Sequence, residues 1–135
     1  MGLLIDASVL IEHERGRLDL GAAVESREGE EFFLSVVTAS ELLHGVRRAE
    51  GPAGRARRSA FVEAVLSSFP LLPVDLLTAR THARIGAELE KRGERIGAHD
   101  LWIAAACVAH GLTVASGNER EFRRVPGLEV EVWSG

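Results

Sequence analysis

The sequence has little cysteine, little lysine and no long apolar run, and each shortage excludes a class of protein. Cys107 is the only cysteine among 135 residues, so no disulfide can form within the chain, as is usual in a reducing compartment. The longest apolar run, Leu101 to Ala109, is shorter than the roughly 20 residues of a membrane-spanning helix. No basic segment precedes the first apolar stretch, as a secretory signal peptide requires. We therefore expect a cytoplasmic protein that has no contact with a membrane.

The charge of the chain gives no overall attraction to nucleic acid, because the formal net charge is −4. The kind of basic residue is more informative, since all but one of the 16 basic residues are arginine and only Lys91 is lysine. The planar guanidinium group can bind a phosphate through two hydrogen bonds. A GC-rich genome would produce the same bias, so arginine content alone does not predict a nucleic-acid partner.

Short apolar segments alternate with helical patterns along the whole chain, which predicts one α/β domain over residues 1–135. We expect a mainly parallel central sheet of four to five strands, flanked by helices on both faces. The predicted strands are 2–5, 31–35, 71–74, 112–116 and, at the edge of the sheet, 128–133. The predicted helices are 8–14, 18–27, 38–49, 55–68, 76–92, 98–110 and 119–123. The Gly-Pro-Ala-Gly segment at 51–54 predicts a break between two of them.

Four polar residues follow apolar strands or lie near predicted helix starts: Asp6, Glu41, Asp100 and Asn118. In parallel sheets, sites form beyond the carboxyl ends of the strands, where Asp6 and Asn118 fall. Asp6 ends a strand that is apolar on both faces, and a buried charge requires a partner or a metal ion. Several carboxylates at one edge would repel one another unless a cation lay between them. Oxygen ligands of this kind favour Mg²⁺ or Mn²⁺.

Local explanations for the same residues remain open. Thr38 and Glu41 match a capping box, and Asn118 with Glu121 matches a looser form of it. Asp100 lies near a predicted helix start, where it could complement the helix dipole. Ser8 could be an N-cap.

Three segments in order carry a resemblance to a known family: LIDASVLIE, VVTASELLHGV and IGAHDLWIAAACVAHGLTVASGNEREFRRVPGLEVEVW. Together they resemble the PIN-domain ribonucleases, and most closely the VapC-type toxins, over nearly the whole chain. The resemblance implies a PIN-like fold and Mg²⁺- or Mn²⁺-dependent cleavage of RNA that leaves a 5′ phosphate. It also implies a VapB-type antitoxin encoded beside the toxin, and a homodimer.

The resemblance also implies roles for individual residues. Asp6, Glu41 and Asp100 match the catalytic acids that bind the metal ion. Asn118 falls on a fourth metal-binding position that many members fill with Asp, so the number of bound ions is left open. Ser8 and Ser116 match small hydroxyl positions that we expect to contact substrate. Arg120 is the expected phosphate contact, with further candidates among Arg47, Arg48, Arg55, Arg57, Arg58, Arg123 and Arg124.

Three other functions fit parts of the same pattern. A phosphatase with an aspartyl nucleophile needs a second Asp two residues after the first, and that position is Ser8. A PIN fold that binds RNA without cleaving it is opposed by the three acids but stays possible because of Asn118. Cleavage of DNA rather than RNA cannot be decided from these residues, because contacts to the 2′-hydroxyl cannot be read from one sequence.

Overall fold

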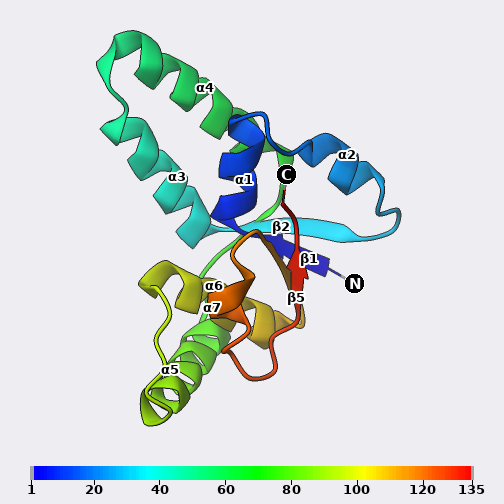
Figure 1. The fold of residues 1–135 in the computed structure, drawn as a ribbon, viewed down its shortest axis with the longest axis vertical. Helices are drawn as coiled ribbons and strands as arrows, with labels where there is room; N and C mark the ends of the chain where they lie inside the picture. Colours follow the sequence, from blue (N-terminus) through cyan, green and yellow to red (C-terminus); the bar gives the residue numbers. More distant parts are fainter. Residues whose placement is uncertain (1, 135) are drawn as a thin grey trace.

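A computed structural model describes residues 2–134 of the chain. Its five strands form one parallel sheet in the order β3-β2-β1-β4-β5 (Figure 1). The prediction of a short parallel α/β sheet is therefore confirmed, including an edge position for the last strand. The strands are β1 (Gly2–Ile5), β2 (Glu31–Ser35), β3 (Leu71–Leu72), β4 (Thr113–Ser116) and β5 (Val130–Val132).

Seven helices within the described residues connect and cover these strands. They are α1 (Ala7–Glu14), α2 (Leu20–Glu25), α3 (Val36–Arg48), α4 (Gly51–Ser68), α5 (Leu76–Lys91), α6 (Ala98–His110) and α7 (Glu119–Phe122). The alternation of side chains along β1 divides the core between two faces. Leu3 and Ile5 pack with residues of α1, α2, α3 and α4, whereas Leu4 packs with residues of α5, α6 and α7. Figure 1 shows these two groups of helices on opposite sides of the sheet.

The strand order reverses beside β1, and this reversal fixes where a site can form. The chain adds β2 and β3 on one side of β1, then returns to place β4 and β5 on the other. The helices that follow β1 and β4 diverge at such a point, so a crevice can form at the carboxyl ends of these two strands. Ile5 pairs with Ala115 in the parallel register, so Asp6 and Ser116 come next at the same edge. The backbone N–H of Asp6 donates to the carbonyl of Ala115 at 2.9 Å.

Some local predictions were wrong. The predicted break between two helices is present, but it falls at residues 49–50, and the 51–54 segment begins α4. Gly51 has a left-handed conformation and a proline lies in the first turn, a position that tolerates proline because its N–H would be unpaired anyway. Leu43 of α3 and Leu77 of α5 are exposed although both are apolar, with exposed fractions of 41% and 51%. α3 starts at Val36, directly after β2, because Ser35 both ends the strand and caps the helix.

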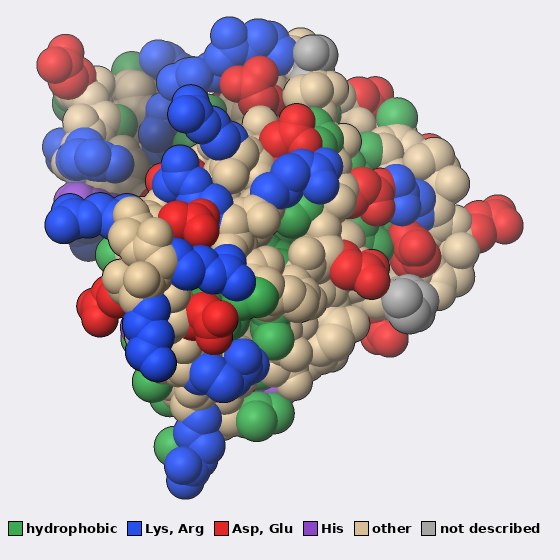
Figure 2. All heavy atoms as spheres, turned by 60° about the horizontal axis from the view of Figure 1, so that its bottom comes forward, with side chains coloured by type: hydrophobic (Ala, Val, Ile, Leu, Met, Phe, Trp, Pro, Cys, Tyr) green, Lys and Arg blue, Asp and Glu red, His purple; other side chains and the backbone are tan. Residues whose placement is uncertain are grey.

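Among residues 2–134, no helix is both long and apolar enough to cross a membrane. Figure 2 shows Lys and Arg side chains interspersed with Asp and Glu on the face that it presents, rather than one continuous basic area. This distribution agrees with a net charge that is close to balanced.

Candidate active site

Asp6 is the most buried carboxylate of the predicted set, with an exposed fraction of 5%. It is the N-cap of α1, because its backbone is extended and its side chain accepts a bond from the backbone N–H of Ser8 at 3.4 Å. The hydroxyl groups of Ser8 and Ser116 donate to the same oxygen, Oδ2, at 2.7 and 2.9 Å. The alternative of Ser8 as N-cap is therefore wrong. Three donors at one oxygen stabilise a buried negative charge.

The two serines also accept bonds from the loop after β4. The backbone N–H of Gly117 donates to Ser8 Oγ at 3.0 Å, and that of Asn118 donates to Ser116 Oγ at 2.9 Å. Ser116 is completely buried and Ser8 is half-buried. The structure thus brings both serines to the site, but as partners of Asp6 and of the backbone.

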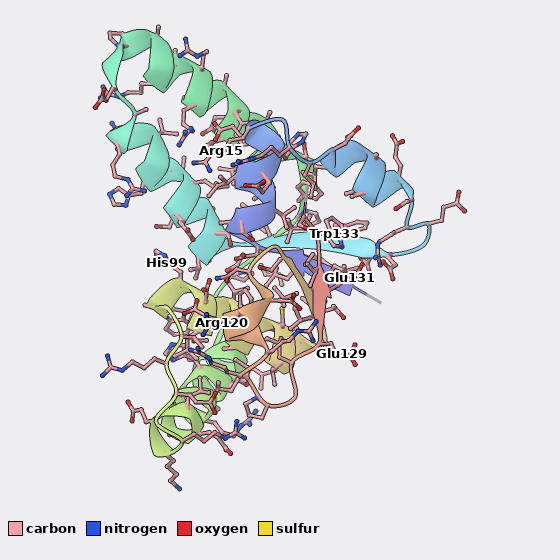
Figure 3. The ribbon with its side chains drawn as sticks, in the orientation of Figure 1. Arg15, His99, Arg120, Glu129, Glu131 and Trp133 are labelled. Carbon is pink, nitrogen blue, oxygen red and sulfur yellow. The ribbon has the colours of Figure 1, made fainter. Side chains whose placement is uncertain are left out.

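Glu41 lies in the second turn of α3, so it does not form a capping box with Thr38. The capping interpretation is wrong because the helix begins at Val36 and its cap is Ser35. Burial and the charge of Asp6 raise the pKa of Glu41, while His99 and Arg48 oppose the increase. His99 Nδ1 lies 3.6 Å from Glu41 Oε1. Figure 3 shows His99 at the start of α6, facing the first turns of α3.

Asp100 is half-buried in the first turn of α6, where the helix dipole can stabilise its charge as the local alternative supposes. Its surroundings nevertheless oppose that charge. Burial, a hydrogen bond with Glu121 and the charges of Asp6, Glu121 and Glu41 raise the pKa of Asp100 to about 7. The three predicted acids are therefore close enough to act on one another, and a fourth acid joins them.

Glu121 of α7 is that fourth acid, and sequence reasoning assigned it no role in the site. Its capping-box match with Asn118 offered a local explanation. Asn118 is the N-cap residue of α7, but its side chain makes no capping bond and instead donates from Nδ2 to Glu121 Oε2 at 3.4 Å. Asn118 is exposed beside the acids. The signal that could have identified Glu121 is its position one helical turn after Asn118, in the short helix that follows β4.

The acids come from four elements but do not form a closed metal site. Among residues 2–134, no three Asp, Glu, His or Cys side chains are close enough to hold a metal ion as they stand. The donor set is nevertheless made of oxygen ligands, which suit Mg²⁺ or Mn²⁺ rather than zinc. A cation between Asp100, Glu41 and Glu121 would offset the burial of Asp100 and the charges of its neighbours, which together raise its pKa. By its chemistry, the arrangement fits a hard divalent ion.

Basic side chains lie near the acids, but they are not gathered at them. Arg120 is exposed on α7 (Figure 3) and makes no ion pair within the described part of the chain. Arg48 is close enough to lower the pKa of Glu41. Two of the other predicted phosphate contacts are engaged elsewhere, since Arg58 pairs with Glu14 at 2.7 Å and Arg123 with Glu119 at 2.7 Å. Arg120 and Arg48 are therefore the better candidates.

The chain is similar to PIN-domain proteins in sequence and to VapBC structures in fold. A model of the PIN domain family matches residues 3–128. Ribonuclease VapC1 of Rickettsia felis is 38% identical over 133 residues, covering 96% of this chain and 95% of that protein. The tRNA(fMet)-specific endonuclease VapC of Salmonella typhimurium is 33% identical over 122 residues, covering 90% and 85%. The crystal structure of DNA-bound VapBC from S. typhimurium superposes with a TM-score of 0.88 at 26% identity, covering 98% of each chain.

Proposed function

Because the chain belongs to the PIN-domain family and to its VapC group, we propose that it is a metal-dependent endoribonuclease, the toxin of a VapBC-type pair. The observation that carries this proposal is the set of carboxylates at the carboxyl edge of the sheet. Burial, a hydrogen bond with Glu121 and the charges of the neighbouring acids raise the pKa of Asp100 to about 7, and a bound cation would lower it. A fold that merely bound RNA would gain nothing from acids that repel phosphate.

Asp6, Glu41, Asp100 and Glu121 are the proposed ligands of Mg²⁺ or Mn²⁺, with Asn118 able to offer a neutral amide oxygen. When bound, such an ion neutralises charge on a phosphate and lowers the pKa of a bound water. Asp6 is held in place by three hydrogen bonds, which suits a ligand that must be rigid. Glu41 lies 3.6 Å from His99 and its pKa is raised by burial, so it is also a candidate to accept a proton. Arg120 and Arg48 supply positive charge for the RNA backbone.

The test is incubation of the purified protein with a mixed RNA pool and, separately, with initiator tRNA, the substrate in the name of the Salmonella relative. Each reaction is run with Mg²⁺, with Mn²⁺ and with a chelator, and a DNA pool serves as the control. We expect cleavage of RNA alone, only with metal, leaving ends that carry a 5′ phosphate. Equal cleavage in chelator would contradict the metal requirement. RNA binding without any cleavage would favour the inactive binding module.

A VapB-type antitoxin is the proposed partner, by analogy with the VapBC complexes that share the fold. We also place the activity in the cytoplasm, where an antitoxin made beside the toxin would meet it. Coexpression with the product of the adjacent gene should yield a complex that lacks ribonuclease activity. Full activity in that complex would contradict this assignment.

A homodimer is the proposed oligomeric state. Exposed apolar side chains gather where β3 leads into α5, with fractions of 42% at Leu71, 42% at Val74, 66% at Leu76 and 51% at Leu77. Contiguous exposed apolar surface of this kind is typical of an interface, and β3 is also an unpaired sheet edge. Leu76→Asp should convert a dimer into a monomer in light scattering, whereas Leu43→Asp, on α3, should not.

A further inference from the structure

The loop between β4 and α7 is connected to Asp6 through two hydroxyl groups. Ser8 Oγ lies between Asp6 Oδ2 at 2.7 Å and the backbone nitrogen of Gly117 at 3.0 Å. Ser116 Oγ lies in the same way between Asp6 Oδ2 at 2.9 Å and the backbone nitrogen of Asn118 at 2.9 Å. Two parallel chains of hydrogen bonds therefore join the end of β1 to the segment that leads to Glu121.

The number of protons determines the direction of every bond in this arrangement. A hydroxyl group has one proton to donate, whereas a carboxylate only accepts and a backbone N–H only donates. Both hydroxyls must therefore give their proton to Asp6 while they accept from the loop. The two hydroxyl oxygens lie 3.2 Å apart, but neither has a second proton for that contact. Each serine hydroxyl therefore accepts one hydrogen bond from the loop and donates one to the Asp6 carboxylate.

The two hydroxyl groups therefore have no proton left to donate to RNA. Ser116 is 0% exposed, so a substrate cannot reach it. The Ser8 hydroxyl already donates its hydrogen bond to Asp6. All three hydrogen bonds to Asp6 are donated to Oδ2, and no described residue donates to Oδ1. The serines thus select which carboxylate oxygen is left available.

We propose that Ser8 and Ser116 are positioning residues, not substrate contacts: they hold Asp6 through Oδ2 so that Oδ1 is left for a cation, and they fix the Gly117–Asn118 loop that places Glu121. The metal-binding part of this inference rests on the proposed function. The connection between loop and carboxylate does not, since it follows from the hydrogen bonds alone. The two parts can therefore be tested separately.

The first measurement is backbone amide exchange by NMR in Ser8→Ala and Ser116→Ala. Each variant removes the acceptor of one N–H only. Exchange at Gly117 should rise about tenfold in Ser8→Ala, and exchange at Asn118 by about the same factor in Ser116→Ala, as expected for one lost hydrogen bond. Thr81→Val is the control, because it removes a buried hydroxyl that bonds only within α5, to Leu77. It should leave both amides unchanged.

The second measurement is Mn²⁺ affinity by calorimetry, together with the kinetics of RNA cleavage. The double variant Ser8→Ala, Ser116→Ala should bind Mn²⁺ roughly 10–100-fold more weakly, as is typical when a group that supports a ligand is lost. At saturating metal, kcat should fall while KM for RNA stays constant, because no substrate contact is removed. Ser8→Thr keeps a hydroxyl at a half-buried position and should leave both values as they are in the wild type.

Unchanged exchange at Gly117 and Asn118 in the alanine variants would overturn the inference. So would a rise in KM with unchanged Mn²⁺ affinity, which would return the serines to the substrate. Asp6→Asn separates the proposed function from the inference, because its amide oxygen can still accept from both hydroxyls. If Asp6→Asn keeps full ribonuclease activity, the proposed function fails even when the loop amides remain protected.

Discussion

Asp6 and Asp100 are two aspartates at one edge of the sheet, and they lie in opposite environments. Asp6 is almost fully buried, yet it accepts bonds from two hydroxyls and one backbone N–H. Asp100 is only half-buried, yet that burial, a hydrogen bond with Glu121 and the charges of Asp6, Glu121 and Glu41 raise its pKa to about 7. Burial disfavours the charge of a carboxylate, and hydrogen-bond donors such as those around Asp6 offset that cost.

The difference suggests a division of work within the site. Asp6 is already stabilised by the protein and offers a fixed ligand. Asp100, with Glu41 and Glu121 beside it, is ready to exchange its proton for a cation near neutral pH. Asp100 would contribute to the affinity for a bound ion by losing its proton, and Asp6 would fix the position of one ligand oxygen.

The largest expected effect comes from Asp6→Asn. Ribonuclease activity should fall by well over a hundredfold, since removing a group that only supports a ligand already costs roughly 10–100-fold. The fold should persist, because Asn has nearly the same shape and keeps an acceptor for both serines. Cleavage assays and circular dichroism on the same sample check both parts. A folded variant that cleaves RNA normally would remove Asp6 from the mechanism.

Metal ions should stabilise the folded protein, because the acids are gathered only in that state. An ion at 100 times its dissociation constant adds about 2.7 kcal/mol to the free energy of unfolding, or roughly 10 °C in Tm for a chain of this size. Thermal melts with and without Mn²⁺ at pH 8 measure it, and the gain should shrink in Asp100→Asn. A wild-type melt that ignores both Mn²⁺ and Mg²⁺ would mean that the acids do not share an ion.

Without metal, Asp100→Asn should stabilise the protein at pH 8. The pKa of Asp100 is raised from its ordinary 3.8 to about 7, so the folded state binds more protons between those values and loses stability as the pH rises through that range. The gain in unfolding free energy should be on the order of 1 kcal/mol, since a half-exposed group is screened, and should vanish near pH 4. Denaturant titrations at both pH values test this. An equal gain at both would point to packing instead.

The smallest effect is expected for Asn118→Asp. An added carboxylate should lower the Mn²⁺ concentration for half-maximal cleavage, although repulsion from Glu121, which Asn118 now contacts at 3.4 Å, limits the gain. Metal titrations of the cleavage rate at fixed RNA compare the two forms. Superimposable curves would remove Asn118 from the site and leave the acids alone to bind the ion.

The sequence predicted the sheet, because short apolar strands alternating with helices admit few other topologies. Asp6, Glu41 and Asp100 lie close enough to act on one another, while their role as catalytic metal ligands stays a prediction. The sequence could not predict the start of α3 at Val36, since β2 runs into the helix without a loop to signal the change. It did not identify Glu121, because the match of Asn118 and Glu121 to a capping box gave that residue a local explanation, which the structure does not bear out. Nor could it show that the hydroxyls of Ser8 and Ser116 are already engaged, since hydrogen-bond direction depends on coordinates.

A cation that binds beside Asp100 should replace its proton, and the carboxyl ¹³C chemical shift of Asp100 reports on this exchange directly. A pH titration by NMR without metal should give a pKa near 7 for Asp100. With saturating Mg²⁺ the pKa should fall below its metal-free value by more than one unit, because the ion competes with the proton. A pKa near the ordinary 3.8 without metal, or one that Mg²⁺ leaves unchanged, would contradict the account.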